Sequence, residues 1–96
     1  MNLVDALRFT ATVESAPLNI GGFIERGEVI RLSDGGAVRW LGGFDLVRLR
    51  DFVHEAITMP QLVKLMVTQG VSAEKSFSII QWCYAKGILA GARERF

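Results

Sequence analysis

Cysteine and histidine are scarce in this chain of 96 residues, and their scarcity excludes several kinds of site. The single cysteine, Cys83, excludes an internal disulfide, and one thiol cannot build a multi-cysteine metal site. A lone thiol is typical of the reducing cytosol. The first residues lack the pattern of a signal peptide, and no stretch approaches the roughly 18 uninterrupted apolar residues of a membrane span. We therefore expect a cytoplasmic protein without a membrane segment.

Charge of one sign is also missing. Eleven basic and ten acidic residues leave a formal net charge of +1, without the basic excess that binding to a phosphate backbone usually needs, so we expect no nucleic-acid partner. Hydrophobic residues, in contrast, make up 50% of the chain, with a mean hydropathy of +0.29. Such a chain can bury a core as a single domain, residues 1–96, and still expose apolar side chains to a partner.

The N-terminal half has the patterns of strands and turns. Apolar and polar residues alternate in the first segment, which is the period of a half-buried strand, and Pro17 and Asn19 are expected to end it. Two later β-prone runs flank Ser33-Asp34-Gly35-Gly36, a segment that favours a hairpin turn. The predicted strands are Leu7–Val13, Glu28–Leu32 and Ala37–Leu41.

Helical spacing replaces this pattern after Gly42-Gly43. Asp45 is expected to cap the first helix, Thr58 to begin the second through a capping box, and Ser72 to cap the third. Gly70 is expected to stop the second helix in a left-handed conformation. The predicted helices are Leu46–Val53, Thr58–Gly70 and Ser72–Gly87, followed by an extended piece, Ile88–Ala90, and a frayed tail, Arg93–Phe96.

This order predicts an α+β fold of the winged helix-turn-helix type: an N-terminal three-stranded antiparallel sheet followed by three helices. Catalytic chemistry has little support in it. His54 has no nucleophile or orienting partner, and a histidine near a helix C-terminus is favoured structurally by the dipole. Cys83 lies on the apolar stripe of the third helix with Phe77 and Ile80, where a thiol behaves as a small hydrophobe. We expect no enzyme activity, no cofactor and no metal site.

The two tryptophans are the more informative side chains. Trp40 shares a face of its predicted strand with Val38, so it either packs against the helices or borders a groove for a ligand. Trp82 falls at the edge of the apolar stripe of the third helix, where an indole suits either partial burial or a partner surface.

The chain resembles the PqqD-like family of peptide recognition elements from ribosomal peptide natural-product pathways. The resemblance covers about Val29 to Ala90: the hairpin, the first helix, the polar start Thr58-Met59-Pro60-Gln61-Leu62, and Ile79-Ile80-Gln81-Trp82-Cys83 running into Lys86-Gly87-Ile88-Leu89. That last block is the most specific part. The chain departs from the family after the hairpin, where a Leu-Asn step is common and Leu41 is here followed by Gly42.

The resemblance implies a domain that binds the leader segment of a precursor peptide and delivers it to a modifying enzyme, such as a radical SAM or cyclising enzyme. The leader would add as a β-strand to the open edge of the sheet, a mode in which main-chain hydrogen bonds give affinity and side-chain pockets give selectivity. The residues expected to supply the backbone ladder are Ala37, Val38, Arg39, Trp40 and Leu41. Those expected to line the helix wall are Lys75, Ser78, Ile79 and Trp82.

Two other functions remain open. A DNA-binding winged helix, acting as a transcriptional regulator, would use Ser72–Lys86 as its recognition helix and Ser33–Gly36 as its wing tip. Lys75 and Lys86 are few cations for that task, and Trp82 stands where a base-reading polar residue would be expected. The chain could instead be an accessory subunit that scaffolds a larger enzyme. A free sheet edge would also permit a homodimer.

Overall fold

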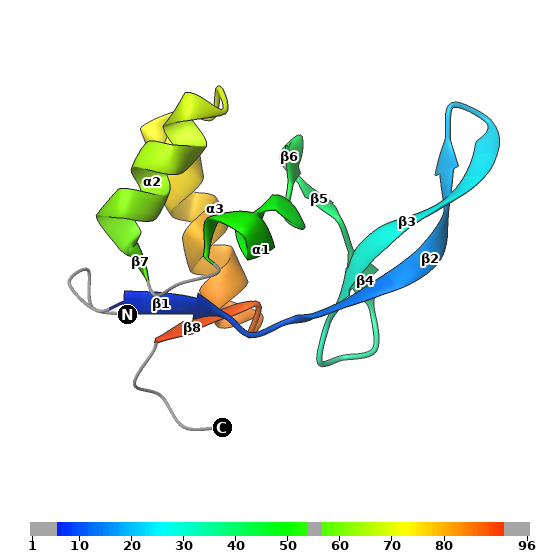
Figure 1. Ribbon diagram of the computed structural model, residues 1–96, viewed down its shortest axis with the longest axis horizontal. Helices are drawn as coiled ribbons and strands as arrows, with labels where there is room; N and C mark the ends of the chain where they lie inside the picture. Colours follow the sequence, from blue (N-terminus) through cyan, green and yellow to red (C-terminus); the bar gives the residue numbers. More distant parts are fainter. Residues whose placement is uncertain (1–5, 54–56, 92–96) are drawn as a thin grey trace.

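The computed structural model describes residues 6–53 and 57–91, which form an α+β structure with antiparallel sheets. Three helices pack with short strands in one body, and a long hairpin extends from it (Figure 1). This confirms the predicted α+β class. The elements are β1 (Ala6–Phe9), β2 (Thr12–Ile20), β3 (Phe23–Arg31), β4 (Ala37–Val38), β5 (Trp40–Leu41), β6 (Phe44–Asp45), α1 (Arg48–Phe52), β7 (Ile57–Thr58), α2 (Met59–Thr68), α3 (Ala73–Ala85) and β8 (Leu89–Gly91).

The predicted order, one N-terminal three-stranded sheet followed by three helices, is wrong. β7 lies between α1 and α2, β8 follows α3, and the strands form three separate small sheets. β1 pairs with β7 and β8, and Leu7 lies opposite both Ile57 and Gly91. Alternation of apolar and polar residues identifies a strand but not its partner, so the pattern could not place β1 in the correct sheet.

The predicted first strand is also broken in two. β1 ends at Phe9 and β2 begins at Thr12, and Thr10 extends the ladder with β8 by one residue before the strand is interrupted. Its N–H donates to the Ile88 carbonyl (2.9 Å), and its hydroxyl donates to the Gly87 carbonyl (2.8 Å). The chain therefore leaves the small sheet here and enters a different one.

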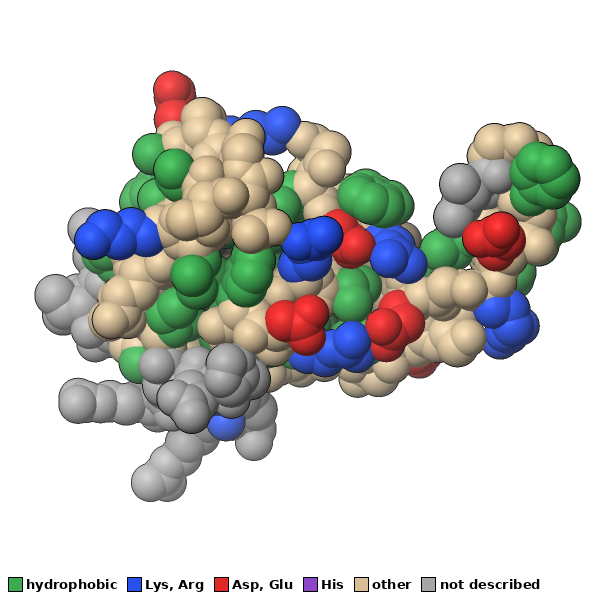
Figure 2. Space-filling model, turned by 45° about the horizontal axis from the view of Figure 1, so that its top comes forward, with side chains coloured by type: hydrophobic (Ala, Val, Ile, Leu, Met, Phe, Trp, Pro, Cys, Tyr) green, Lys and Arg blue, Asp and Glu red, His purple; other side chains and the backbone are tan. Residues whose placement is uncertain are grey.

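The largest unpredicted feature is the hairpin of β2 and β3, with nine residues in each strand. The expectation that Pro17 and Asn19 end the strand is wrong, because β2 runs through both and pairs with β3 along its whole length. Gly21 and Gly22 make the turn at φ of +59° and +88°, which a two-residue hairpin turn requires and glycine adopts readily. The distal part of this hairpin projects clear of the body (Figure 2).

The hairpin predicted between Glu28–Leu32 and Ala37–Leu41 forms only next to its turn. β3 and β4 pair at two positions, Ile30 with Val38 and Arg31 with Ala37. The chain then leaves β3, and β5 pairs with β6 across the turn at Gly42-Gly43. The predicted strand Ala37–Leu41 is thus divided between two sheets.

One core joins β1, the helices and β8 to the root of the long hairpin. Ile80 and Cys83 are buried as predicted, whereas Phe77 is 38% exposed and Ile79 takes its place in the core. The largest fully buried apolar side chains are Leu7, Ile30, Leu46, Leu49, Met59, Leu62, Met66, Ile80, Ile88 and Leu89.

The predicted ends of α2 and α3 are confirmed. Thr58 and Gln61 form a capping box, in which each side chain bonds the other residue's backbone N–H. The Ser72 hydroxyl accepts from the N–H of Lys75 (3.2 Å), and Gly70 ends the turn before it with φ of +87°. These bonds satisfy amides that would otherwise lack partners.

Among the helices described, none is long and apolar enough to cross a membrane. The predictions for His54 and for the tail Arg93–Phe96 concern residues outside the described ranges.

The cap at Ser72 gives a direct test of the α3 boundary. Replacing Ser72 with alanine removes the acceptor for the Lys75 amide and should lower the free energy of unfolding by about 1 kcal/mol, measured by urea denaturation. Ser78→Ala, also at an exposed position on α3, is the control and should change stability by less than about 0.5 kcal/mol. Equal losses from both substitutions would contradict the assignment of the cap.

Candidate functional site

Five predicted site residues from distant parts of the chain meet at one apolar hollow. Its volume is about 280 Å³, and it lies between the end of β5 and one face of α3. Leu41, Lys75, Ser78, Ile79 and Trp82 line it together with Gly42. The predicted helix wall and the end of the predicted strand are therefore brought together.

Helical geometry explains the α3 side of this hollow. Lys75, Ser78, Ile79 and Trp82 are spaced three or four residues apart, so their side chains share one face of the helix. Ile79 is only 3% exposed and forms the floor, while Trp82 is half-buried. The Lys86 ammonium lies 5.8 Å from the centroid of the Trp82 ring, at the next turn. Apolar surface at the centre with polar groups around it suits a single apolar side chain of a ligand.

The other predicted site residues do not line this hollow. Ala37 and Val38 pair with β3, and Val38 packs partly against the core. Trp40 is 59% exposed, which excludes the alternative that it is a core residue.

The outer edge of Ala37–Leu41, the strand expected to pair with the peptide, is occupied along its second half. The carbonyl of Arg39 accepts from the N–H of Leu46 (2.7 Å), and the ladder continues through Trp40 with Asp45 and Leu41 with Phe44. The expectation that Ala37–Leu41 offers a continuous open edge is therefore wrong. The signal that could have shown this is the Gly42-Gly43 pair, which is typical of a two-residue hairpin turn between β5 and β6.

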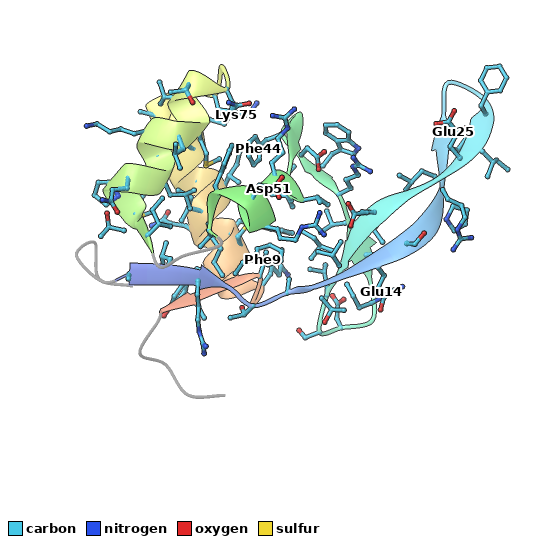
Figure 3. The ribbon with its side chains drawn as sticks, viewed as in Figure 1. Phe9, Glu14, Glu25, Phe44, Asp51 and Lys75 are labelled. Carbon is cyan, nitrogen blue, oxygen red and sulfur yellow. The ribbon has the colours of Figure 1, made fainter. Side chains whose placement is uncertain are left out.

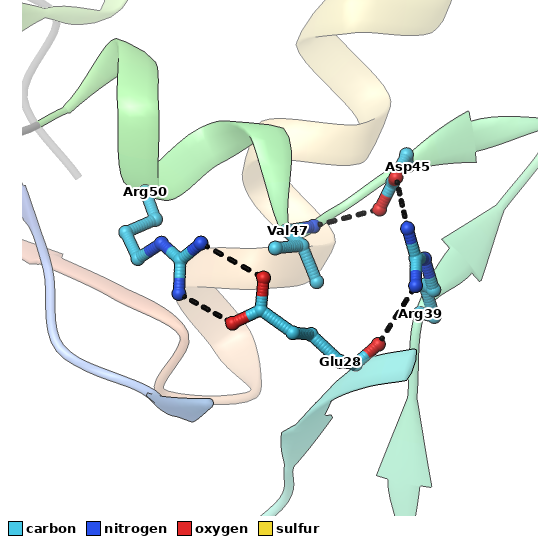
Figure 4. Close-up of polar contacts among 5 residues, drawn as sticks. All are labelled: Glu28, Arg39, Asp45, Val47 and Arg50. Carbon is cyan, nitrogen blue, oxygen red and sulfur yellow. Dashed lines mark hydrogen bonds and ion pairs between the residues drawn. The ribbon is translucent and has the colours of Figure 1, made fainter. Parts of the chain in front are cut away.

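A polar network holds β5 and β6 at an angle to β3 (Figure 4). One guanidinium nitrogen of Arg39 donates to the carbonyl of Glu28 (3.3 Å), and another donates to the Asp45 carboxylate (3.1 Å). The second carboxylate oxygen of Asp45 accepts from the N–H of Val47 (3.1 Å). The prediction that Asp45 caps α1 is wrong, because Asp45 lies in β6 and the N-cap residue is Val47. The Asp45 carboxylate nevertheless accepts from the amide of this N-cap residue.

Glu28 also joins the long hairpin to α1. Arg50 donates two hydrogen bonds to its carboxylate, at 2.8 and 3.1 Å. These bonds hold the pKa of Glu28 below its ordinary value. Both side chains are exposed, so this pair positions the hairpin and contributes little to overall stability.

A second, more polar hollow of about 540 Å³ adjoins the first and shares Gly42 and Lys75 with it. Phe44 and Lys75 lie on the same side of the molecule here (Figure 3). Arg48 on its wall donates to the Gln69 side chain (2.7 Å). Trp40, a predicted site residue, also lines this hollow. Sequence reasoning missed the rest of its wall, which is formed by Gly43, Phe44, Asp45, Arg48, Gln69, Gly70, Val71 and Ser72.

Comparison of the chain with protein families, with curated proteins and with solved structures gives no match. In the described residues, no group of three or more His, Cys, Asp or Glu side chains could hold a metal ion.

Burial makes Cys83 a test of the packing behind this site. Burial raises the pKa of its thiol to about 12, so the thiol stays protonated in the folded chain where an unfolded chain would begin to ionise. At about pH 8, labelling by a disulfide reagent should be at least ~100-fold slower in the folded protein than in guanidinium chloride. The stability that this burial contributes should be lost as the pH rises above the ordinary pKa of a thiol. Equal labelling rates would show that the core does not cover the thiol of α3.

Proposed function

We propose that this protein binds the leader segment of a ribosomally synthesised precursor peptide by β-strand addition and presents it to a separate modifying enzyme, such as a radical SAM or cyclising enzyme. The observation that carries the proposal is the apolar hollow that joins Leu41 to Ile79 and Trp82. An accessible apolar hollow beside sheet elements is what the recognition of an extended peptide requires.

The hollow has the size and chemistry for one anchoring side chain. Burying a leucine- or phenylalanine-sized group there would contribute about 1.5–3 kcal/mol. Lys75 and Gly42 also line the adjoining polar hollow, so a chain that crosses both would place a polar group beside its apolar anchor. Selectivity would then come from the order of the two kinds of side chain.

The proposal includes the winged helix-turn-helix fold. The order α1, β7, α2, α3, β8 supports this, because a winged helix also has a strand between its first two helices and another after its third, and here β1 lies between β7 and β8. The turn between α2 and α3 is short and passes through Gly70 at φ of +87°. In a fold of this type α3 would be the recognition helix.

The composition of α3 supports a peptide over DNA as the ligand. Lys75 and Lys86 are accompanied by Glu74, and the half-buried Trp82 lies between them in the sequence. Few cations face a phosphate backbone in that arrangement, which would make binding weak at physiological salt. Duplex DNA is therefore the natural competing probe.

The test is a calorimetric titration with a synthetic peptide that covers the N-terminal segment of any short reading frame adjacent to this gene. Binding tighter than ~100 μM is expected, since specific recognition in this mode should exceed −5.5 kcal/mol. No binding at that concentration would overturn the proposal, and salt-dependent binding to duplex DNA in its place would favour a transcriptional regulator.

Filling the hollow gives a residue-level test. Ser78→Trp places a large side chain in the hollow without removing a core residue and should weaken peptide binding by about tenfold or more, because the anchoring side chain is displaced. The matched control is Gln81→Trp, an exposed position of α3 that does not line the hollow. An unchanged affinity for Ser78→Trp would show that the peptide binds elsewhere.

A further inference from the structure

We infer that the open edge of β3, from Ile24 to Arg26, supplies the backbone ladder for the bound peptide. The peptide would extend the sheet along the projecting hairpin and not along Ala37–Leu41. This inference rests on the proposed function and names the surface that holds the main chain of the peptide.

The register shows which backbone groups of β3 point to this edge. In an antiparallel ladder, the N–H and C=O of successive residues point alternately to opposite sides. The N–H of Leu32 donates to the Gly36 carbonyl (2.8 Å), and Ile30 pairs with Val38, both on the β4 side. Every second residue toward the tip therefore points to the same side, and these residues are Glu28, Arg26 and Ile24.

β4 covers only the inner end of this edge. Its pairing with β3 stops at Val38, and no other strand within the described ranges pairs with β3 on that side. At Glu28 the carbonyl accepts from the side chain of Arg39 instead of from a backbone amide. Beyond Glu28, the outward-facing groups of Arg26 and Ile24 remain open, over about 7 Å of strand edge at the usual rise of about 3.3 Å per residue. An open edge of this kind is a template for another extended chain.

The opposite edge of the hairpin is protected. Pro17 of β2 lies opposite Arg26, and by the same alternation its nitrogen points outward. Proline has no N–H, so the middle of the β2 edge lacks the donor that a pairing strand needs. The hairpin thus disfavours pairing along β2 and permits it along β3, which also argues against edge-to-edge pairing of two copies through β2.

Exposed apolar side chains indicate what the open edge binds. Ile24 is 78% exposed and Phe23 is 73% exposed, on opposite faces of β3, and Trp40 is 59% exposed beside the Arg39 that closes the inner end. In Figure 1 the two strands of the hairpin twist about each other, and only the inner part of β3 lies toward β5 and β6. The neighbouring charges, Glu25 and Arg26, are of opposite sign and favour neither sign in the ligand. The occupant that fits is an extended peptide with apolar side chains, which would cover these groups on pairing.

A proline scan of the two edges tests this assignment. Arg26→Pro removes the outward N–H of β3 but leaves the ladder with β2 intact, and it should weaken binding of the synthetic leader peptide by about tenfold. Ser15→Pro is the matched control, because Ser15 lies opposite Glu28 and its N–H points outward from β2. Both variants lose the same side-chain hydrogen bond between Arg26 and Ser15 (3.3 Å). Arg26→Ala keeps the N–H and should bind like the unmodified protein.

The outcomes separate this inference from the proposed function. If the unmodified protein binds the peptide and Arg26→Pro binds it equally well, the ladder is not on β3, although peptide binding stands. If the unmodified protein does not bind, both proposals fail. If both proline variants unfold at the melting temperature of the unmodified protein, the substitutions have not disrupted the fold. A loss of binding by Ser15→Pro alone would place the ladder on β2. Peptide-free dimers that Arg26→Pro dissociates would identify a second copy as the occupant and overturn the inference.

Discussion

The chain departs from β3 at Arg39, and this departure determines where β5 and β6 lie and which part of β3 lacks a neighbouring strand. The guanidinium of Arg39 takes the carbonyl of Glu28, pairs with the partly buried carboxylate of Asp45 and lies 5.5 Å from the centroid of the Trp40 ring. Gly27 leaves room for this guanidinium, because a Cβ there would lie 3.0 Å from it and would also require the end of the Leu18 side chain to move. The cation takes the place of a neighbouring strand, so β5 turns away without leaving that carbonyl unpaired.

Two surfaces follow from this divergence. β5 turns toward α3 and pairs with β6, which places Leu41 against Ile79 and Trp82 and closes the outer edge of β5. The distal part of β3 loses its neighbour on the same side, and its backbone groups are left facing outward. A peptide that used both surfaces would gain directional main-chain bonds from one and an apolar anchor from the other.

Local chemistry in the sequence was enough to predict the parts of the fold that depend on neighbouring residues. The capping box at Thr58, the cap at Ser72 and the stop at Gly70 are each decided within four residues, and all three are confirmed. Strand partners depend on contacts between distant residues, so the sheet of β1 and the long β2–β3 hairpin were not predicted. Pro17 was expected to end the strand. It lies instead on an outer edge, where the missing N–H costs nothing, and this position is visible only in three dimensions. In the site, the spacing along α3 identified four residues that line the apolar hollow, while Ala37–Leu41 was expected to be a continuous open edge because the β5–β6 turn was missed.

Amide hydrogen exchange, measured residue by residue with and without the leader peptide, shows directly whether the edge of β3 holds the main chain of the peptide. If the peptide pairs with β3, the amides of Ile24 and Arg26 should exchange rapidly in the free protein and at least about tenfold more slowly in the complex, while the amide of Ala37 should be unaffected. Slowed exchange at Ala37, with no change at Ile24 and Arg26, would contradict this pairing.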